Sequence, residues 1–90
     1  MFEIVYHSEV VRRDIPKLSA PVRTRIRHSI ETRLSTQPDL YGKPLRRSLH
    51  GYHKLRVGDY RVIFTIDDAQ VKILMIAHRS IVYRDVAKRV

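Results

Sequence analysis

The side chains of this sequence best suited to chemistry are cations that lie close to a histidine and a tyrosine. Basic residues alternate with apolar ones between Gly51 and Arg61, and further polar residues follow near position 80. The cationic candidates are Lys54, Arg56, Arg61 and Arg79, and the proton-transfer candidates are His78 and Tyr83. Fixed positive charge beside a group that can move a proton suits a reaction in which negative charge develops on a phosphate.

This set fits metal-independent RNA cleavage, in which the 2′-OH attacks the adjacent phosphate to give a 2′,3′-cyclic phosphate and a 5′-OH. The step needs a base, an acid and positive charge around the phosphorane. A tyrosine base needs neighbouring cations to stabilise its phenolate. Simpler roles stay open: Tyr83 packs its ring on the sheet, His78 merely ends a strand, and Arg56 supports a turn or binds an acidic partner.

Missing motifs narrow the chemistry further. The sequence has no cysteine, which excludes disulfides, thiolate catalysis and cysteine zinc sites. It also lacks a Walker loop, a dinucleotide glycine fingerprint, a nucleophile elbow and an HExxH motif. Its 5 histidines fit no metal-ligand spacing, and their basic surroundings repel cations. We therefore expect neither a metal nor a cofactor.

The charge balance points to an anionic partner. Lysine and arginine number 18 against 9 acidic residues, a formal net charge of +9. Such an excess favours phosphate backbones, anionic membranes or an acidic protein. The N-terminal residues carry no secretory signal, and no run approaches the roughly 20 apolar residues of a membrane span. We expect a cytoplasmic protein that does not engage a membrane.

A two-residue turn at Gly58-Asp59 is predicted to set the register of the cationic stretch. The predicted pairs are Val57 with Tyr60, Arg56 with Arg61, Leu55 with Val62 and Lys54 with Ile63. One face is then apolar, and the other carries Lys54, Arg56 and Arg61. Directly opposed arginines repel each other, and a polyanion bound between them would offset this repulsion. The pair is therefore a candidate polyanion-binding site.

The apolar run from Val71 to Ala77 predicts a third strand, reached through a turn at Asp68-Ala69. The predicted pairs are Ile66 with Val71, Phe64 with Ile73, Val62 with Met75 and Tyr60 with Ala77. Strict alternation then places His78 on the cationic face. It places Ile63, Leu74 and Ile76 there too, either exposed to a partner or covered by the C-terminal segment.

Two helices are expected before the hairpin, after a first strand over residues 2–7. The first begins near Glu9 with Ser8 as its cap, has Val11, Ile15 and Leu18 on one face, and kinks or ends near Pro16. The second has Ser19 as its cap and Pro21 in its first turn. Its apolar stripe is Val22, Ile26, Ile30 and Leu34. Its arginines form either a solvated basic face or a nucleic-acid contact.

The expected order is β-α-α-β-β-β followed by a C-terminal helix or tail. Two consecutive helices followed by a meander indicate an α+β fold, with a small antiparallel sheet and both N-terminal helices packed on one face. We expect residues 1–90 to form one domain.

Three segments of the sequence resemble the RelE/ParE toxin superfamily of bacterial toxin-antitoxin systems, and its RelE-type branch in particular. They are Lys-Leu-Arg-Val-Gly-Asp-Tyr-Arg-Val-Ile-Phe from Lys54 to Phe64, Ala-His-Arg at 77–79 and Val-Tyr-Arg at 82–84. The resemblance covers nearly the whole chain and implies the same fold. It also implies a ribosome-dependent mRNA endonuclease that cuts the codon displayed in the ribosomal A site and inhibits translation.

The resemblance also implies roles for individual residues. Lys54, Arg56 and Arg61 would hold the scissile phosphate, and Arg79 would stabilise the transition state or act as acid. Tyr83 resembles the C-terminal tyrosine proposed as base, and His78 shares or replaces that role. Arg46 and Arg47, in the basic loop before the hairpin, would bind RNA phosphate. Tyr52 is a departure, because the RelE branch has a further lysine there.

The implied partners are the ribosome with its mRNA and an acidic, partly disordered antitoxin, which would also carry any operator DNA binding. The ParE branch supplies the alternative, because it shares the fold but inhibits DNA gyrase and cleaves no RNA. ParE-type toxins generally lack the full basic set with its terminal tyrosine, whereas that set is complete here. A non-enzymatic RNA-binding module would leave His78 and Tyr83 without a role.

Overall fold

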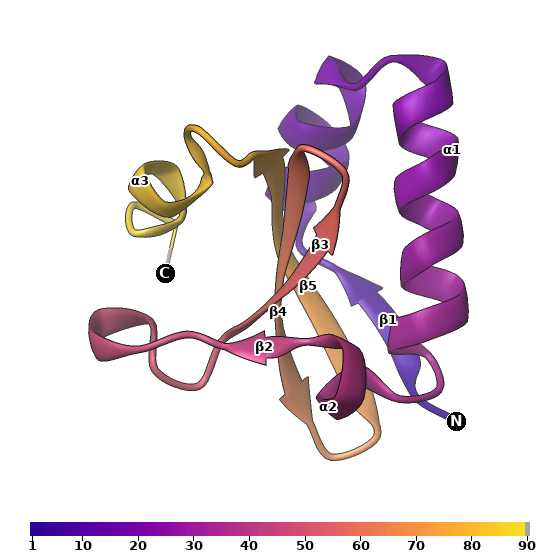
Figure 1. Cartoon of the computed structure of the whole chain (residues 1–90), viewed down its shortest axis with the longest axis vertical. Helices are drawn as coiled ribbons and strands as arrows, with labels where there is room; N and C mark the ends of the chain where they lie inside the picture. Colours follow the sequence, from indigo (N-terminus) through magenta and orange to yellow (C-terminus); the bar gives the residue numbers. More distant parts are fainter. Residues whose placement is uncertain (90) are drawn as a thin grey trace.

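A five-stranded sheet separates the long helix α1 from a short helix and an extended loop on its other side (Figure 1). The computed structural model describes residues 1–89. The strands are β1 (Glu3–Tyr6), β2 (Lys43–Pro44), β3 (His53–Val57), β4 (Tyr60–Asp67) and β5 (Gln70–His78). The α-helices are α1 (Ala20–Ser29), α2 (Pro38–Tyr41) and α3 (Val82–Val86). Other helical turns are η1 (Val10–Asp14), η2 (Ile15–Lys17), η3 (Ile30–Leu34) and η4 (Arg47–Leu49).

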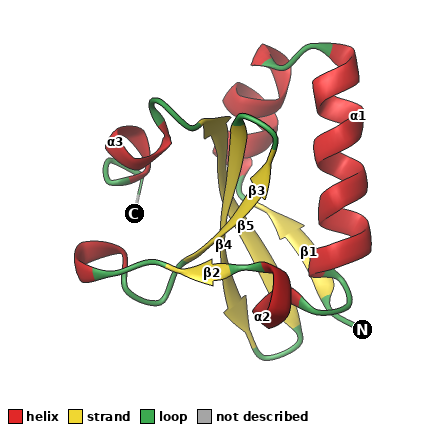
Figure 2. Cartoon of the chain, viewed as in Figure 1, coloured by secondary structure: helices red, strands yellow, loops and turns green. Residues whose placement is uncertain are grey.

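The strand order in the sheet is β1-β5-β4-β3-β2. Strands β2 to β5 pair antiparallel, whereas β1 pairs parallel with the first half of β5. Helices and strands are segregated along the chain rather than alternating (Figure 2), which confirms the predicted α+β class. The parallel pairing of β1 was not predicted.

Both predicted hairpin turns are present. Gly58 has φ +60°, a conformation that glycine adopts without strain, and the four predicted pairs between β3 and β4 are all observed. At the second turn Asp68 has φ +54°, and Asp67 pairs with Gln70. The turns therefore set the strand registers as the sequence indicates.

A β-bulge in β5 overturns part of the predicted register. Ile66 pairs with Val71 and Phe64 with Ile73 as expected, but Ile63 then pairs with Met75, so Leu74 is an extra residue. Beyond this point the observed pairs are Val62 with Ile76, Arg61 with Ala77 and Tyr60 with His78. The predicted pairs Val62 with Met75 and Tyr60 with Ala77 are wrong.

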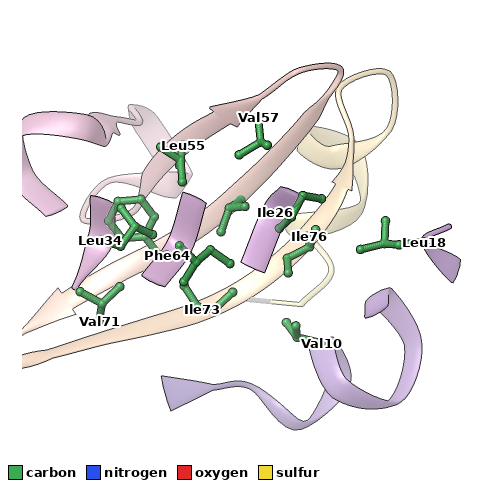
Figure 3. Packing of buried hydrophobic residues seen from close by; sticks show 12 residues of the cluster. Val10, Leu18, Ile26, Leu34, Leu55, Val57, Phe64, Val71, Ile73 and Ile76 are labelled. Atoms are coloured by element: carbon green, nitrogen blue, oxygen red, sulfur yellow. The ribbon is translucent and has the colours of Figure 1, made fainter. Parts of the chain in front are cut away.

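The face covered by α1 and η3 holds the larger core. The Ser19 hydroxyl accepts a hydrogen bond from the Val22 N–H and caps α1 as predicted. The stripe residues Ile26, Ile30 and Leu34 pack against strand residues that include Phe64 and Ile73 (Figure 3). Burial of this apolar surface is the main force that holds the helix on the sheet.

The N-terminal helical segment differs from its prediction in detail. It ends at Lys17, just after Pro16, as expected, but Ser8 is not its N-cap. The buried residue is Val10 rather than the exposed Val11, because Val10, Asp14 and Leu18 recur every fourth residue along a partly π-helical path. None of the helices described in residues 1–89 combines the length and apolar character needed to cross a bilayer.

A smaller cluster of Ile63, Met75, Val82 and Val86 covers the opposite face. Leu45, Leu49 and Tyr52 from the loop around η4 pack against it. Two alternatives were open for Ile63 and Ile76, exposure to a partner or cover by the C-terminal segment. Cover is confirmed for Ile63, which α3 buries, and neither alternative holds for Ile76, because the bulge turns it into the larger core. Leu74 is half-buried beside the smaller cluster.

Candidate active site

The centre of the candidate site is a row of cations on the face of the sheet that carries α3. Arg56 pairs directly with Arg61, and Lys54 lies two residues further along β3. Side chains two residues apart on a strand point to the same side, about 6–7 Å from each other. The predicted placement of Lys54, Arg56 and Arg61 on one face is therefore confirmed.

Tyr83 joins this row from α3. Its neighbour Val82 and the later Val86 are buried against Ile63, which leaves the Tyr83 ring on the outer side of the helix with 39% of its surface exposed. The Lys54 Nζ lies 5.6 Å from the centroid of the Tyr83 ring. A cation at this distance over a ring face is attracted to it, and more strongly when the ring is an electron-rich phenolate.

Arg61 is anchored by the hairpin turn. Its Nη1 donates to the backbone oxygens of Gly58 at 3.0 Å and Tyr60 at 2.9 Å, and the side chain is half-buried. Arg56 directly opposite is exposed. The two carbonyl dipoles stabilise the Arg61 charge and so offset part of its repulsion with Arg56.

Arg79 lies at the turn end of the same row. Its backbone N–H donates to the Asp59 oxygen at 2.8 Å, and its Nε lies 3.9 Å from the Asp59 carboxylate. With 61% of its side chain exposed, this ion pair contributes little to stability and leaves the guanidinium free to bind another anion. The row thus runs from Arg79 through Arg61 and Arg56 to Lys54 and Tyr83.

His78 does not join the row, which corrects the prediction that placed it there. The bulge pairs it with Tyr60 on the face of the larger core, with the two rings edge-to-face at a centroid distance of 5.6 Å. Its Nδ1 accepts the Ser80 N–H at 3.1 Å and lies 2.8 Å from the Ser80 hydroxyl. A backbone N–H can only donate, so the neutral ring carries its proton on Nε2.

Arg46 and Arg47 lie at the rim of this face. Both are exposed at the start of η4, and Arg47 has φ +59°. The surrounding loop is held to the site face because the Leu45 N–H donates to the Tyr52 oxygen at 2.8 Å. Tyr52, where the RelE branch has a lysine, packs its side chain against the cluster beneath the site.

Two charged groups on the exposed side of α3 neutralise each other. The Arg84 Nε donates to Asp85 Oδ1 at 2.9 Å. This hydrogen bond is the main reason that the pKa of Asp85 is lowered and the pKa of Arg84 is raised from their ordinary values. The paired Arg84 therefore adds little net charge beside Tyr83.

Sequence reasoning missed Asp14 and Arg89, which are joined across the fold. The Arg89 guanidinium contacts both carboxylate oxygens of Asp14, at 2.6 and 3.1 Å. The available signal was Asp14 itself, a charged residue in the middle of the period-four stripe between Val10 and Leu18. A charge in an apolar stripe indicates a buried partner, but the pattern does not say which residue supplies it.

A hollow of about 620 Å³ lies away from the cationic row. It follows the β5 edge between η1, η2 and the C-terminal segment, and His78 is the only predicted site residue that lines it. The side chains of the row do not line this hollow, and Arg56, Arg79 and Tyr83 are exposed to solvent.

The chain matches one toxin family model and is similar in sequence to two toxins of known name. Residues 6–83 match the family model described as "ParE toxin of type II toxin-antitoxin system, parDE". A Mycobacterium tuberculosis protein named Toxin RelE is 40% identical over 74 residues, spanning 80% of this chain and 76% of the relative. Another from the same organism, named Toxin RelG, is 38% identical over 82 residues, spanning 89% of this chain and 94% of the relative.

Solved structures of toxins have the same fold as this chain. A chain in the crystal structure of the toxin-antitoxin complex RelBE2 from M. tuberculosis superimposes with a TM-score of 0.81 at 35% identity, covering 87% of this chain and 98% of that chain. The isolated E. coli RelE toxin shares the fold with a TM-score of 0.71 at 18% identity, covering 99% and 98% of the two chains. The predicted resemblance is confirmed: this chain belongs to the RelE/ParE superfamily, as a RelE-family toxin of a type II toxin-antitoxin system.

Proposed function

We propose that this toxin is a ribosome-dependent mRNA endonuclease that acts in the cytoplasm and stops translation. The observation that supports this most is the position of the Lys54 ammonium over the Tyr83 ring, beside Arg56 and Arg61 on the same face. A cation there stabilises the phenolate that a tyrosine base requires. The relatives named Toxin RelE and Toxin RelG are consistent with this branch.

The reaction uses only side-chain charge and proton transfer. Tyr83, as phenolate, takes the proton of the 2′-OH, and the 2′-oxygen attacks the adjacent phosphorus. Lys54, Arg56 and Arg61 stabilise the negative charge that builds on the phosphorane oxygens. The bond from phosphorus to the 5′-oxygen then breaks; the leaving oxygen is hydrogen-bonded to Arg79 and takes a proton from water. The products are a 2′,3′-cyclic phosphate and a 5′-OH.

In this proposal the ribosome supplies an alignment that the exposed row does not supply by itself. In-line attack requires the 2′-oxygen, the phosphorus and the leaving oxygen to be aligned, and exposed cations on one face of a sheet do not impose that geometry on flexible RNA. A codon held by the ribosome is already ordered. Arg46 and Arg47 at the rim extend the positive surface toward the flanking backbone. Free RNA should therefore be a poor substrate.

His78 remains a weaker candidate for proton transfer. It lies on the opposite face, and its Nδ1 is engaged with Ser80. Tyr83 is therefore the base in this proposal, and His78 would act only by reaching around the end of β5 with its Nε2.

A cognate antitoxin is the second proposed partner. Several structural neighbours are toxin-antitoxin complexes, including RelBE2 of M. tuberculosis and RelBE of E. coli. The net charge of +9 suits an acidic, partly disordered polypeptide. Any operator DNA would be bound through that antitoxin.

Inhibition of DNA gyrase is the second candidate function, because the matching family model carries the ParE description. A ParE-type toxin would not need a base, so the pairing of Lys54 with Tyr83 would have no catalytic role. The two functions predict different cellular damage, namely cut mRNA or gyrase-linked DNA breaks.

Induction of Tyr83→Phe and Lys54→Ala variants tests the proposal. If Tyr83 is the base, its replacement should lower cleavage by about 10²–10⁴-fold, the usual contribution of general base catalysis. Primer extension on mRNA from induced cells should show codon-phased cuts with the wild-type toxin and none with Tyr83→Phe.

Tyr41→Phe and Lys72→Ala are matched controls, because both residues are exposed and lie outside the row. They should stay fully toxic. Intact mRNA with DNA breaks on wild-type induction would contradict the nuclease and support gyrase inhibition. Full cleavage by Tyr83→Phe would remove Tyr83 from the mechanism.

A further inference from the structure

Among the described residues 1–89, no strand pairs with the outer edge of the second half of β5. β1 pairs only with Gln70 to Ile73, so β5 continues beyond it as an edge strand from Leu74 to His78. Two side chains occupy this edge. The Ile76 N–H donates to Asp14 Oδ2 at 2.9 Å, and Arg89 Nη1 donates to the Leu74 oxygen at 3.1 Å.

Asp14 and Arg89 are also bonded to each other. Their two contacts, at 2.6 and 3.1 Å, give a bidentate pair, the strongest geometry for an arginine and a carboxylate. Only 13% of the Arg89 side chain and 7% of the Asp14 side chain are exposed. We call this set of contacts, Asp14 and Arg89 on the backbone of Leu74 and Ile76, the edge clasp.

The edge clasp ties down the segment that carries Tyr83. Helix α3 has only 5 residues, too few to be stable by itself. It is held by Val82 and Val86 in a cluster of 4 buried residues. The Arg89 N–H donates to the Val86 oxygen at 2.9 Å, so Arg89 continues directly from this helix. The ionic contact of Arg89 is thus the polar attachment of α3 to the sheet.

We propose that Asp14 and Arg89 are positioning residues, which hold α3 so that Tyr83 stays beside Lys54. Neither residue lies in the cationic row, and neither touches the reacting atoms. Without the edge clasp α3 separates from the sheet and Tyr83 leaves Lys54, while Lys54, Arg56 and Arg61 remain on the β3–β4 hairpin. The loss then falls on the chemical step rather than on RNA binding. The catalytic part of this inference depends on the proposed nuclease function.

The contacts with the backbone require an acceptor at one position of the edge clasp and a donor at the other. Position 14 must accept a hydrogen bond from an N–H, and position 89 must donate to a carbonyl oxygen. An arginine cannot accept the first bond, and an aspartate cannot donate the second. Exchanging the two charges would therefore preserve an ion pair but break both backbone contacts, so it should not restore α3.

The experiment compares Arg89→Ala, Arg89→Lys and the double variant Asp14→Arg/Arg89→Asp with wild type by NMR and by cleavage on programmed ribosomes. In the wild-type protein the Lys54 side-chain protons near the Tyr83 ring should show a ring-current shift. Arg89→Ala and the double variant should lose that shift, and hydrogen exchange at the Ile76 amide should accelerate. Arg89→Lys keeps the charge and a donor nitrogen but loses the bidentate contact, so it should retain part of the shift.

Cleavage should separate binding from chemistry. For Arg89→Ala we expect kcat to fall by about 10²-fold, the scale of a misplaced catalytic group, with KM nearly unchanged. Arg12→Ala is the matched control, since Arg12 is an exposed arginine on η1, two residues before Asp14 in the sequence, and its loss removes the same charge.

Each outcome decides one part. An unchanged Lys54 shift in Arg89→Ala would overturn the proposal, and recovery of the shift in the double variant would show an ordinary ion pair without the backbone role. A fall in kcat and a rise in KM together, with the shift intact, would also overturn it. If the wild-type toxin cleaves no mRNA, the nuclease proposal fails, and the NMR shift still decides whether the edge clasp positions α3.

Discussion

The two faces of the sheet are built for different purposes. The face under α1 and η3 buries a cluster of 12 residues, whereas the face under α3 buries a cluster of 4. The first face is covered along its length, and the second leaves Arg56 and Arg79 exposed beside a short helix. The fold thus concentrates its stability on one side and leaves exposed cations on the other, beside a short helix attached by few contacts.

The largest expected effect is a loss of stability from a substitution on the face under α1. Phe64 is fully buried between the strands and η3, and Phe64→Ala should cost about 3–5 kcal/mol in the free energy of unfolding. Urea denaturation followed by circular dichroism measures this. A loss below about 1 kcal/mol would mean that this face is not the main source of stability.

A matched pair of valines sharpens the comparison. Val71 and Val86 are both fully buried, but they lie in the larger and the smaller cluster respectively. Val71→Ala should lower global stability by about 1–2 kcal/mol and leave cleavage by the folded protein unchanged. Val86→Ala should open α3 locally. Hydrogen exchange in α3 should then accelerate and cleavage should fall, while the free energy of global unfolding changes less than these two effects would suggest. Equal effects of the two variants on both measurements would contradict the division of roles.

The smallest expected effect concerns pH. Burial, with Glu31 adding to it and Arg27 opposing it, raises the pKa of Tyr6 above 10.0. Above this value the unfolded chain loses the Tyr6 proton while the folded chain keeps it, so stability falls as the pH rises through the folded pKa. Tyr6→Phe should flatten this alkaline loss in denaturation curves between about pH 9 and 11. An unchanged slope in Tyr6→Phe would show that Tyr6 is not the group responsible.

Local signals in the sequence were sufficient for the hairpins and the long helix. Gly58 and Asp59 set the register of β3 and β4, and the stripe from Val22 to Leu34 indicated the buried side of the helix. From that register the face shared by Lys54, Arg56 and Arg61 followed directly. These features depend on neighbouring residues, which periodicity describes well.

The bulge could not be predicted in the same way. Residues 71 to 77 are apolar apart from Lys72, so either register buries apolar side chains and the pattern does not choose between them. One extra residue at Leu74 was enough to move His78 to the other face. The pair of Asp14 and Arg89 was equally hidden, because 75 residues separate the two along the chain.

The parallel pairing of β1 with β5 also determines when the toxin can fold. Residues 3–6 emerge early in synthesis, but their sheet partners are residues 70–73. Asp14 likewise waits for Arg89. Contacts this distant in sequence form slowly and only after both segments exist. The sheet and the attachment of α3 can therefore be completed only after residues 70–89 have been synthesised.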